Sequence, residues 1–96
     1  MAVIRISRNH GLPRADLRVQ VESLADEIQQ KLQARCRWDG DTAHFSRTGA
    51  SGTIKLDDER IAIEITLGLA LSPLKSRVEK TVNERLDQML QSVKLG

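Results

Sequence analysis

The stretch that decides the fold of this chain is Leu67-Gly68-Leu69-Ala70-Leu71-Ser72-Pro73-Leu74-Lys75. An alternating apolar pattern ends in it, and strict period two predicts a half-buried strand carrying Ile61, Ile63, Ile65 and Leu67. Beyond it, apolar residues recur at steps of three and four, which predicts a long amphipathic helix. The apolar stripe of that helix is Leu74, Val78, Val82, Leu86, Met89, Leu90 and Val93. Sheet and helix are therefore expected to pack through this junction, with Ser72 as the N-cap and Pro73 as the first helical residue.

The residues before the junction predict one more helix and four more strands. A strand over residues 2–8 is followed by a break at 9–13 and by a helix from Pro13 to about Arg35. One apolar stripe runs along this helix, formed by Leu17, Val21, Leu24, Ala25, Ile28 and Leu32. Strands over 35–38, 41–47 and 53–56 come next. They are joined by Asp39-Gly40, where both turn positions require positive φ, and by turns at 48–52 and 57–59.

These elements predict a single α+β domain over residues 1–96, in the order strand, helix, four strands, helix. We expect an antiparallel sheet of about five strands, with both helices packed on its apolar face. That face is predicted to carry Ile4, Ile6, Cys36, Trp38, Ala43, Phe45, Ile54, Leu56, Ile61, Ile63, Ile65 and Leu67. The opposite face, which should meet water or a partner, carries Arg5, Arg37, His44, Lys55, Glu64 and Thr66.

Composition and charge restrict the classes of function. The net charge of +2, from fifteen basic and thirteen acidic residues, is too small to indicate nucleic acid or an anionic membrane as partner. Cys36 is the only cysteine, so no intrachain disulfide can form, which fits a reducing cytoplasm. The N-terminal residues lack a signal-peptide pattern, and no apolar run approaches the ~20 residues of a membrane span. The expected location is therefore the cytoplasm, with no transmembrane segment.

No group of residues has the pattern of a catalytic or metal-binding site. His44 lies mid-strand on an open sheet face, where no pocket excludes water, so a solvated surface histidine is the favoured interpretation. His10 lies in a loop, where it either hydrogen-bonds the turn or takes part in function. The two histidines, the cysteine and the carboxylates lack the spacings of zinc and calcium sites. Gly49 and Gly52 precede no helix, unlike a phosphate-binding loop. We predict no cofactor, no metal and no enzymatic activity.

The second long helix begins with basic residues. Lys75, Arg77 and Lys80 lie in its first turns, and the first acid is Glu79. Together with free backbone N–H groups, these cations could receive a phosphate or a carboxylate. Lysines at a helix N-terminus after a meander of strands are also typical of double-stranded RNA readers. The small net charge and the lack of stacking aromatics nevertheless disfavour nucleic acid.

An apolar partner surface is the remaining possibility. Leu69 and Leu71 lie where the chain turns from strand to helix, so they either close the end of the core or form a small exposed patch. We take Leu69, Leu71, Lys75, Arg77 and His10 as the candidate partner surface.

A family resemblance covers nearly the whole chain. The segments that carry it are Ile4-x-Ile6-x-Arg8-x-His10-x-Leu12, Arg37-Trp38-x-Gly40, Phe45-x-Arg47-x-Gly49-x-x-Gly52-x-Ile54, Leu67-Gly68-x-x-Leu71-x-x-Leu74-Lys75-x-x-Val78-Glu79 and Leu86-Asp87-x-x-Leu90. In this order and spacing they resemble the polyhydroxyalkanoic acid system family. These are small bacterial proteins associated with gene regions for polyester storage granules.

The resemblance implies a role in polyhydroxyalkanoate storage and brings no catalytic residues with it. The expected function is that of a non-enzymatic accessory protein, which acts at granules or on another granule-associated protein. One alternative is a small carrier that holds an apolar acyl chain between helices and sheet. Double-stranded RNA binding is a third reading. The sequence assigns no oligomeric state.

Overall fold

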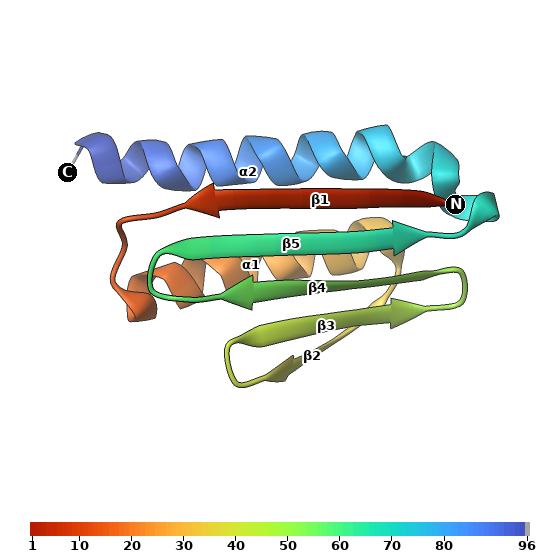
Figure 1. The fold of residues 1–96 in the computed structure, drawn as a ribbon, viewed down its shortest axis with the longest axis horizontal. Helices are drawn as coiled ribbons and strands as arrows, with labels where there is room; N and C mark the ends of the chain where they lie inside the picture. Colours follow the sequence, from red (N-terminus) through yellow and green to blue (C-terminus); the bar gives the residue numbers. More distant parts are fainter. Residues whose placement is uncertain (96) are drawn as a thin grey trace.

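The computed structural model describes the backbone of residues 1–95 and the side chains of residues 1–89. The chain forms β1 (Ala2–Asn9), α1 (Arg14–Leu32), β2 (Arg35–Asp39), β3 (Thr42–Arg47), β4 (Ala50–Leu56), β5 (Arg60–Leu67), the 3-10 helix η1 (Leu69–Leu74) and α2 (Lys75–Leu95). Figure 1 shows the strands as one sheet, with α1 behind it and α2 alongside β1. This element order confirms the predicted α+β architecture.

The sheet has the strand order β1-β5-β4-β3-β2, and all neighbouring strands are antiparallel. The last four strands form a meander, as expected from the short turns between them. The first strand pairs with the last one, so that Ala2 lies opposite Leu67 and Asn9 opposite Arg60. Consequently β1 and β2 are the two edges of the sheet (Figure 1).

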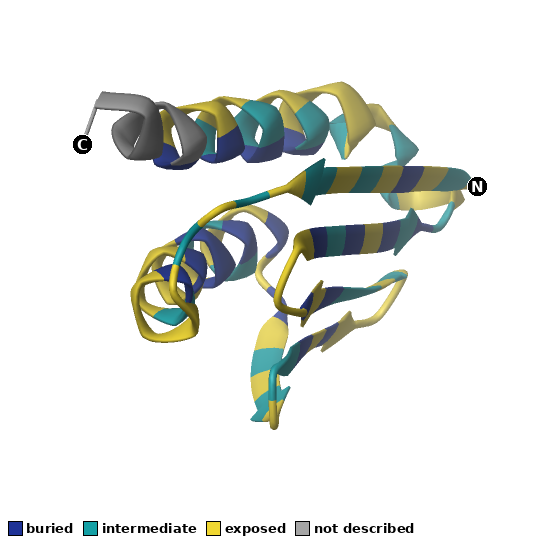
Figure 2. Ribbon diagram, turned by 60° about the vertical axis from the view of Figure 1, so that its left-hand side comes forward, coloured by how far each residue is buried: buried dark blue, intermediate teal, exposed yellow. Residues whose placement is uncertain are grey.

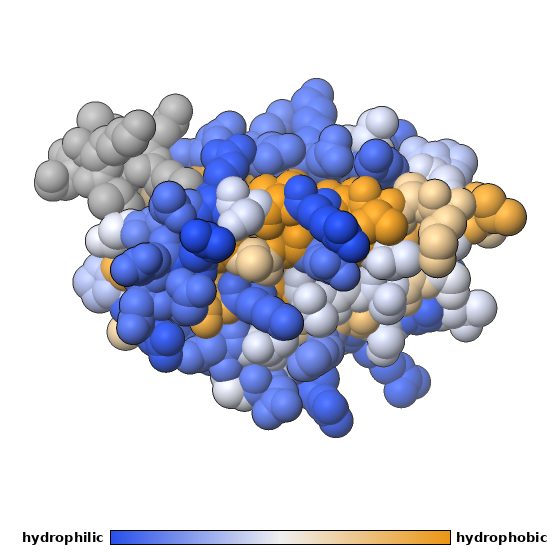
Figure 3. All heavy atoms as spheres, in the orientation of Figure 1, coloured by the Kyte–Doolittle hydropathy of each residue, from blue (hydrophilic) through white to orange (hydrophobic). Residues whose placement is uncertain are grey.

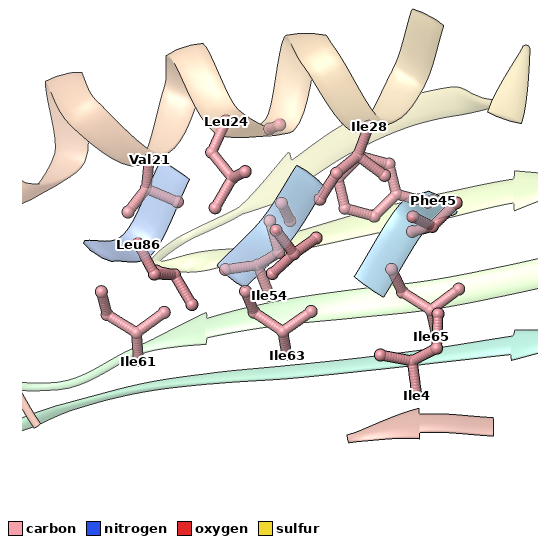
Figure 4. Close-up of a cluster of buried hydrophobic side chains, with 14 of the residues drawn as sticks. Ile4, Val21, Leu24, Ile28, Phe45, Ile54, Ile61, Ile63, Ile65 and Leu86 are labelled. Carbon is pink, nitrogen blue, oxygen red and sulfur yellow. The ribbon is translucent and has the colours of Figure 1, made fainter. Parts of the chain in front are cut away.

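The core lies between the sheet and the two helices. Buried positions alternate along the strands and line the helix surfaces that face the sheet (Figure 2). Twenty described hydrophobic residues are buried, among them every predicted stripe residue of α1. Figure 4 shows side chains from both helices and from four strands pointing toward one another. Their burial supplies the main driving force for folding.

The predicted inward positions are buried or half-buried throughout. Ile6, Cys36 and Trp38 are the half-buried ones on the sheet, while Leu74 is half-buried in η1. Two residues of the predicted second stripe, Leu90 and Val93, lie outside the residues whose side chains are described.

Helix α1 ends earlier than predicted, at Leu32 rather than near Arg35. The next residue, Gln33, has the left-handed φ of 54°, which turns the chain out of the helix. The N–H of Ala34 then donates back to the carbonyl of Gln29 at 3.0 Å. Arg47 donates to the carbonyl of Leu32 at 2.8 Å, so a cation stabilises the helix C-terminus. Glutamine seldom adopts a left-handed φ. The sequence therefore carried no sign that the helix ends at Leu32, and the predicted helix was too long.

The β2–β3 turn differs by one residue from the prediction. Asp39 pairs with Thr42, so the two turn residues are Gly40 and Asp41. Only Gly40 has positive φ, at 60°, and the expectation of positive φ at Asp39 is wrong. A two-residue turn that begins with glycine needs positive φ only at that glycine.

Strand β4 begins at Ala50, three residues before the predicted start at Thr53. The turn before it contains only Thr48 and Gly49, and the φ of 87° at Gly49 makes this tight turn possible. The small residues that follow had suggested a loop, but they pair with both neighbouring strands.

The junction after β5 is helical earlier than predicted. Ser72 is not an N-cap, because its hydroxyl donates backward to the carbonyl of Gly68 at 3.0 Å. Pro73 lies inside η1, and α2 begins at Lys75. Gly68 is extended and donates to the carbonyl of Gly49 at 2.7 Å. This bond fixes the junction against the β3–β4 turn.

Candidate partner-binding surface

Exposed apolar side chains gather at the junction end of the sheet. Within the described residues, the large hydrophobic side chains that are exposed are Met1 (81%), Val3 (39%), Val19 (67%) and Leu69 (83%). Only Val19 lies elsewhere, on α1. Figure 3 shows an apolar band that runs along β1 beneath α2 and reaches the end of the molecule where η1 lies.

The pairing of β1 with β5 explains this gathering. Because Ala2 lies opposite Leu67, the start of β1 is adjacent to the residues that follow β5, which include Leu69. Val3 and Thr66 are paired on the open face of the sheet. We call Met1, Val3, Leu69, Lys75 and Arg77 the junction patch.

The structure separates the two leucines of the candidate surface. Leu69 is almost fully exposed, whereas Leu71 is half-buried and packs against the core. A Cβ placed on Gly49 would lie 3.5 Å from Cδ1 of Leu71, so this leucine covers the β3–β4 turn. Leu71 therefore closes the end of the core, and Leu69 is the one available to a partner.

Lys75 and Arg77 lie at the start of α2 and are exposed. Neither side chain has a hydrogen bond or ion pair to any residue of the described part of the chain. Several other arginines connect the helices to the sheet. Arg8 of β1, for example, donates to Asp87 at 2.8 Å and to Asn83 at 3.0 Å, both on α2. The junction patch thus combines exposed apolar side chains with two cationic side chains that have no partner among the described residues.

His10 is not part of this arrangement. It follows the far end of β1, and its Nε2 lies 2.8 Å from the carbonyl oxygen of Asp57 in the β4–β5 turn. Its Nδ1 accepts the N–H of Leu12 at 3.3 Å. With Nδ1 as acceptor, Nε2 carries the proton and donates to Asp57. Nε2 thus joins two loops, and Nδ1 accepts within the loop that carries His10.

The remaining titratable groups include two whose pKa is shifted, Cys36 and Asp57. No group of three or more His, Cys, Asp or Glu side chains able to hold a metal ion occurs among the described residues. Burial, followed by the charge of Asp26, raises the pKa of the Cys36 thiol. The backbone N–H groups of Glu59 and Arg60 lower the pKa of Asp57, which accepts both of them in a turn.

The open face of the sheet is polar and carries hollows. One of about 310 Å³ is lined in part by Arg5, Lys55 and Glu64. Arg5 and Glu64 form an ion pair of 3.3 Å across neighbouring strands. His44 is exposed on this face, as the sequence predicted.

Sequence reasoning missed Met1 and Val3 as members of the junction patch. Their proximity to Leu69 depends on the pairing of the first strand with the last. A signal was present in Val3, an apolar residue on the predicted polar side of its strand.

The chain matches one protein-family model. The model is described as "Putative polyhydroxyalkanoic acid system protein", and it matches residues 4–90, which run from β1 into α2. The resemblance found in the sequence is therefore confirmed. Comparisons with curated proteins and with solved structures gave no match. None of the described helices has the length and hydropathy required to cross a membrane.

Proposed function

Because the chain belongs to the polyhydroxyalkanoic acid system family, we propose that it is a non-enzymatic accessory protein of polyhydroxyalkanoate storage. It acts in the cytoplasm, at the granule surface or on another granule-associated protein. The observation that supports this proposal is the junction patch, in which Leu69 and Val3 are exposed at the junction end of the sheet and Lys75 and Arg77 are exposed at the start of α2.

The chemistry of the patch suits this role. A storage polyester presents apolar chain segments and ester carbonyls. Leu69 and Val3 can bury apolar area on either target. Lys75 and Arg77 can donate hydrogen bonds to ester carbonyls or pair with carboxylates. The contact needs no bound cofactor and no reacting group.

An acyl-chain carrier receives less support. A carrier needs an apolar cavity of a few hundred cubic ångströms between helices and sheet. In the described part of the chain, that space is occupied by buried side chains such as Leu24, Phe45 and Leu86 (Figure 4). The hollow of about 310 Å³ lies instead over residues of the open sheet face.

Granule association of tagged protein tests the proposal. Wild-type protein should sediment with granules from polymer-accumulating cells. Leu69→Ser should shift it to the supernatant, because this change removes exposed apolar surface and touches no buried residue. Val19→Ser is the matched control, since Val19 is also exposed but lies on α1. It should sediment like the wild type.

A second experiment distinguishes the two possible targets, the granule surface and a granule-associated protein. Purified protein is added to protein-free polymer particles and, separately, to granules that carry their native proteins. Binding to bare particles assigns the granule surface as the target. Binding only to native granules, with a partner identified by mass spectrometry, assigns a protein. Wild-type protein that stays in the supernatant and captures no granule protein contradicts the proposal.

A further inference from the structure

The second edge of the sheet is formed by β2, which carries two exposed arginines. No described element lies beyond β2 in the sheet, and Figure 1 shows it as the outermost strand. Arg35 and Arg37 are exposed, and neither forms an ion pair or hydrogen bond with any described residue. An unprotected edge strand is a template on which another strand can pair.

The backbone of β2 presents its free groups at defined positions. The N–H of Leu56 in β4 donates to the carbonyl of Asp41 at 3.0 Å, so alternate residues of β3 bond toward β4. The residues between them, including His44 and Ser46, bond toward β2, where they face Arg37 and Arg35. The N–H and C=O groups of the intervening Cys36 and Trp38 therefore point away from the sheet.

Side chains of an added strand would meet different surroundings on the two faces. Residues opposite Arg35 and Arg37 would occupy non-hydrogen-bonded pairs, in which antiparallel side chains approach most closely. These two arginines, with His44 and Ser46, line a hollow of about 330 Å³ on the open face. Residues opposite Cys36 and Trp38 would point to the core side, beside two half-buried side chains.

From this placement, we propose that the β2 edge binds an extended acidic peptide segment of a partner protein as a sixth strand. The segment carries carboxylates at alternate positions, opposite Arg35 and Arg37, and apolar side chains between them, opposite Cys36 and Trp38. Backbone hydrogen bonds supply the pairing, and Arg–carboxylate contacts select the sequence. This edge lies on the opposite side of the sheet from β1, and the inference does not rest on the junction patch.

A second copy of the chain fits this edge less well. Two full-length β2 strands paired about a two-fold axis would place Arg35 opposite Asp39 of the second copy at both ends. The same register places Arg37 opposite Arg37 of the second copy at its centre, with like charges in a close pair. An acidic segment can pair with both arginines and has no such like-charge contact at Arg37. A shifted register that brings Arg37 opposite Asp39 of the second copy keeps only three residues of each strand. Charge complementarity therefore favours an acidic partner.

The test uses fluorescein-labelled peptides and fluorescence anisotropy with the full chain. The probe alternates Glu and Val over six residues, and a block peptide of the same composition has its Glu residues first. The alternating peptide should bind better than the block peptide. Its affinity should fall with added salt, as expected for exposed charges. N-methylation at the two Val residues that pair with Cys36 and Trp38 should abolish binding.

Variants of the protein locate the contact. R35E/R37E should weaken binding of the alternating peptide by at least about tenfold, since two charge pairs are reversed. This variant should instead bind a Lys/Val peptide, which the wild type does not bind. K75E/R77E, which makes the same change of net charge in the junction patch, should leave binding within about twofold. Because Arg35 and Arg37 are exposed and unpaired, the melting temperature of R35E/R37E should stay near that of the wild type.

Three results would overturn the proposal. The first is unchanged binding to R35E/R37E. The second is equal affinity for the block peptide or for an oligothymidylate of equal charge, which would indicate unspecific attraction of anions. The third is a homodimer, detected by sedimentation, that dissociates on Arg35→Glu, because Arg35 would then face Asp39 of a second copy and the edge would belong to that copy.

Discussion

Gly52 is the glycine whose replacement the structure predicts to be most harmful. It lies in the central strand β4, directly opposite Phe45 and Ile65 on the two neighbouring strands. A Cβ at this position would lie 2.9 Å from the carbonyl oxygen of Glu64 and 3.0 Å from Cγ1 of Ile65. The first atom belongs to the backbone, so β5 itself must shift to relieve the contact.

The expected cost of Gly52→Ala follows from two opposing effects. Adding a methyl group to a packed core costs about 1–3 kcal/mol. The alanine also reduces the conformational freedom of the unfolded chain, which returns about 0.4–1 kcal/mol. At the middle of these two ranges, the free energy of unfolding should therefore fall by about 1.3 kcal/mol, and the melting temperature by about 5–10 °C for a domain of this size.

Thermal and urea unfolding followed by circular dichroism measure this loss. Gly11→Ala is the matched control, because a Cβ at Gly11 meets nothing within 4 Å and the residue lacks positive φ. That variant should be as stable as the wild type or gain up to about 1 kcal/mol. If Gly52→Ala melts at or above the wild-type temperature, the close contact is relieved without cost and the reasoning is wrong.

Three further predictions concern buried and titrating side chains. Leu86→Ala should lower the free energy of unfolding by about 2–5 kcal/mol, because Leu86 is fully buried between α2 and the sheet. Asp57→Ala should destabilise the protein at pH 7, and the difference from wild type should shrink as the pH falls below about 4. The reason is that the folded state lowers the pKa of Asp57, so its stabilisation is present above the unfolded pKa and is lost on protonation. Asp26→Asn should speed alkylation of Cys36 at pH 8, because the charge of Asp26 contributes to the raised thiol pKa.

Each of these has a result that would contradict it. For Leu86→Ala, urea unfolding with an unchanged midpoint would mean that the side chain is not packed as described. For Asp57→Ala, a difference from wild type that stays constant between pH 7 and pH 3 would remove the carboxylate as its cause. For Asp26→Asn, an unchanged alkylation rate would leave burial as the sole cause of the raised pKa.

Most of the fold was predictable because its signals are local. The period-two run that ends at Leu67 and the stripe from Leu17 to Leu32 each specify an element without knowledge of its neighbours. The failures occur where a small residue has a tertiary role. Gly52 was interpreted as part of a loop, although it is glycine because β5 approaches so closely. Ser72 was interpreted as the N-cap of the second long helix, although the 3-10 helix η1 already begins after Gly68, one turn earlier.

The candidate surface was less predictable because it is assembled from distant residues. Leu69, Lys75 and Arg77 are close in sequence, and η1 leads directly into the start of α2. His10 had been grouped with them, yet it lies at the other end of β1 with both ring nitrogens engaged. Val3 joins the patch only through its pairing with Thr66. No local pattern shows which strand β1 will pair with.

The pairing of β1 with β5 sets the order in which the protein can be completed during synthesis. The strands β2 to β5 are connected by short turns, so each can pair with its predecessor soon after it emerges from the ribosome. The first strand must wait until Leu67 has emerged, and its Arg8 must wait longer for Asn83 and Asp87. Until β5 has emerged, β1 is unpaired and β4 is an edge without its partner, and until α2 has emerged its part of the apolar face is uncovered, so these states are the most open to aggregation. A nascent chain that stalls before the end of α2 should therefore be the species that a chaperone binds.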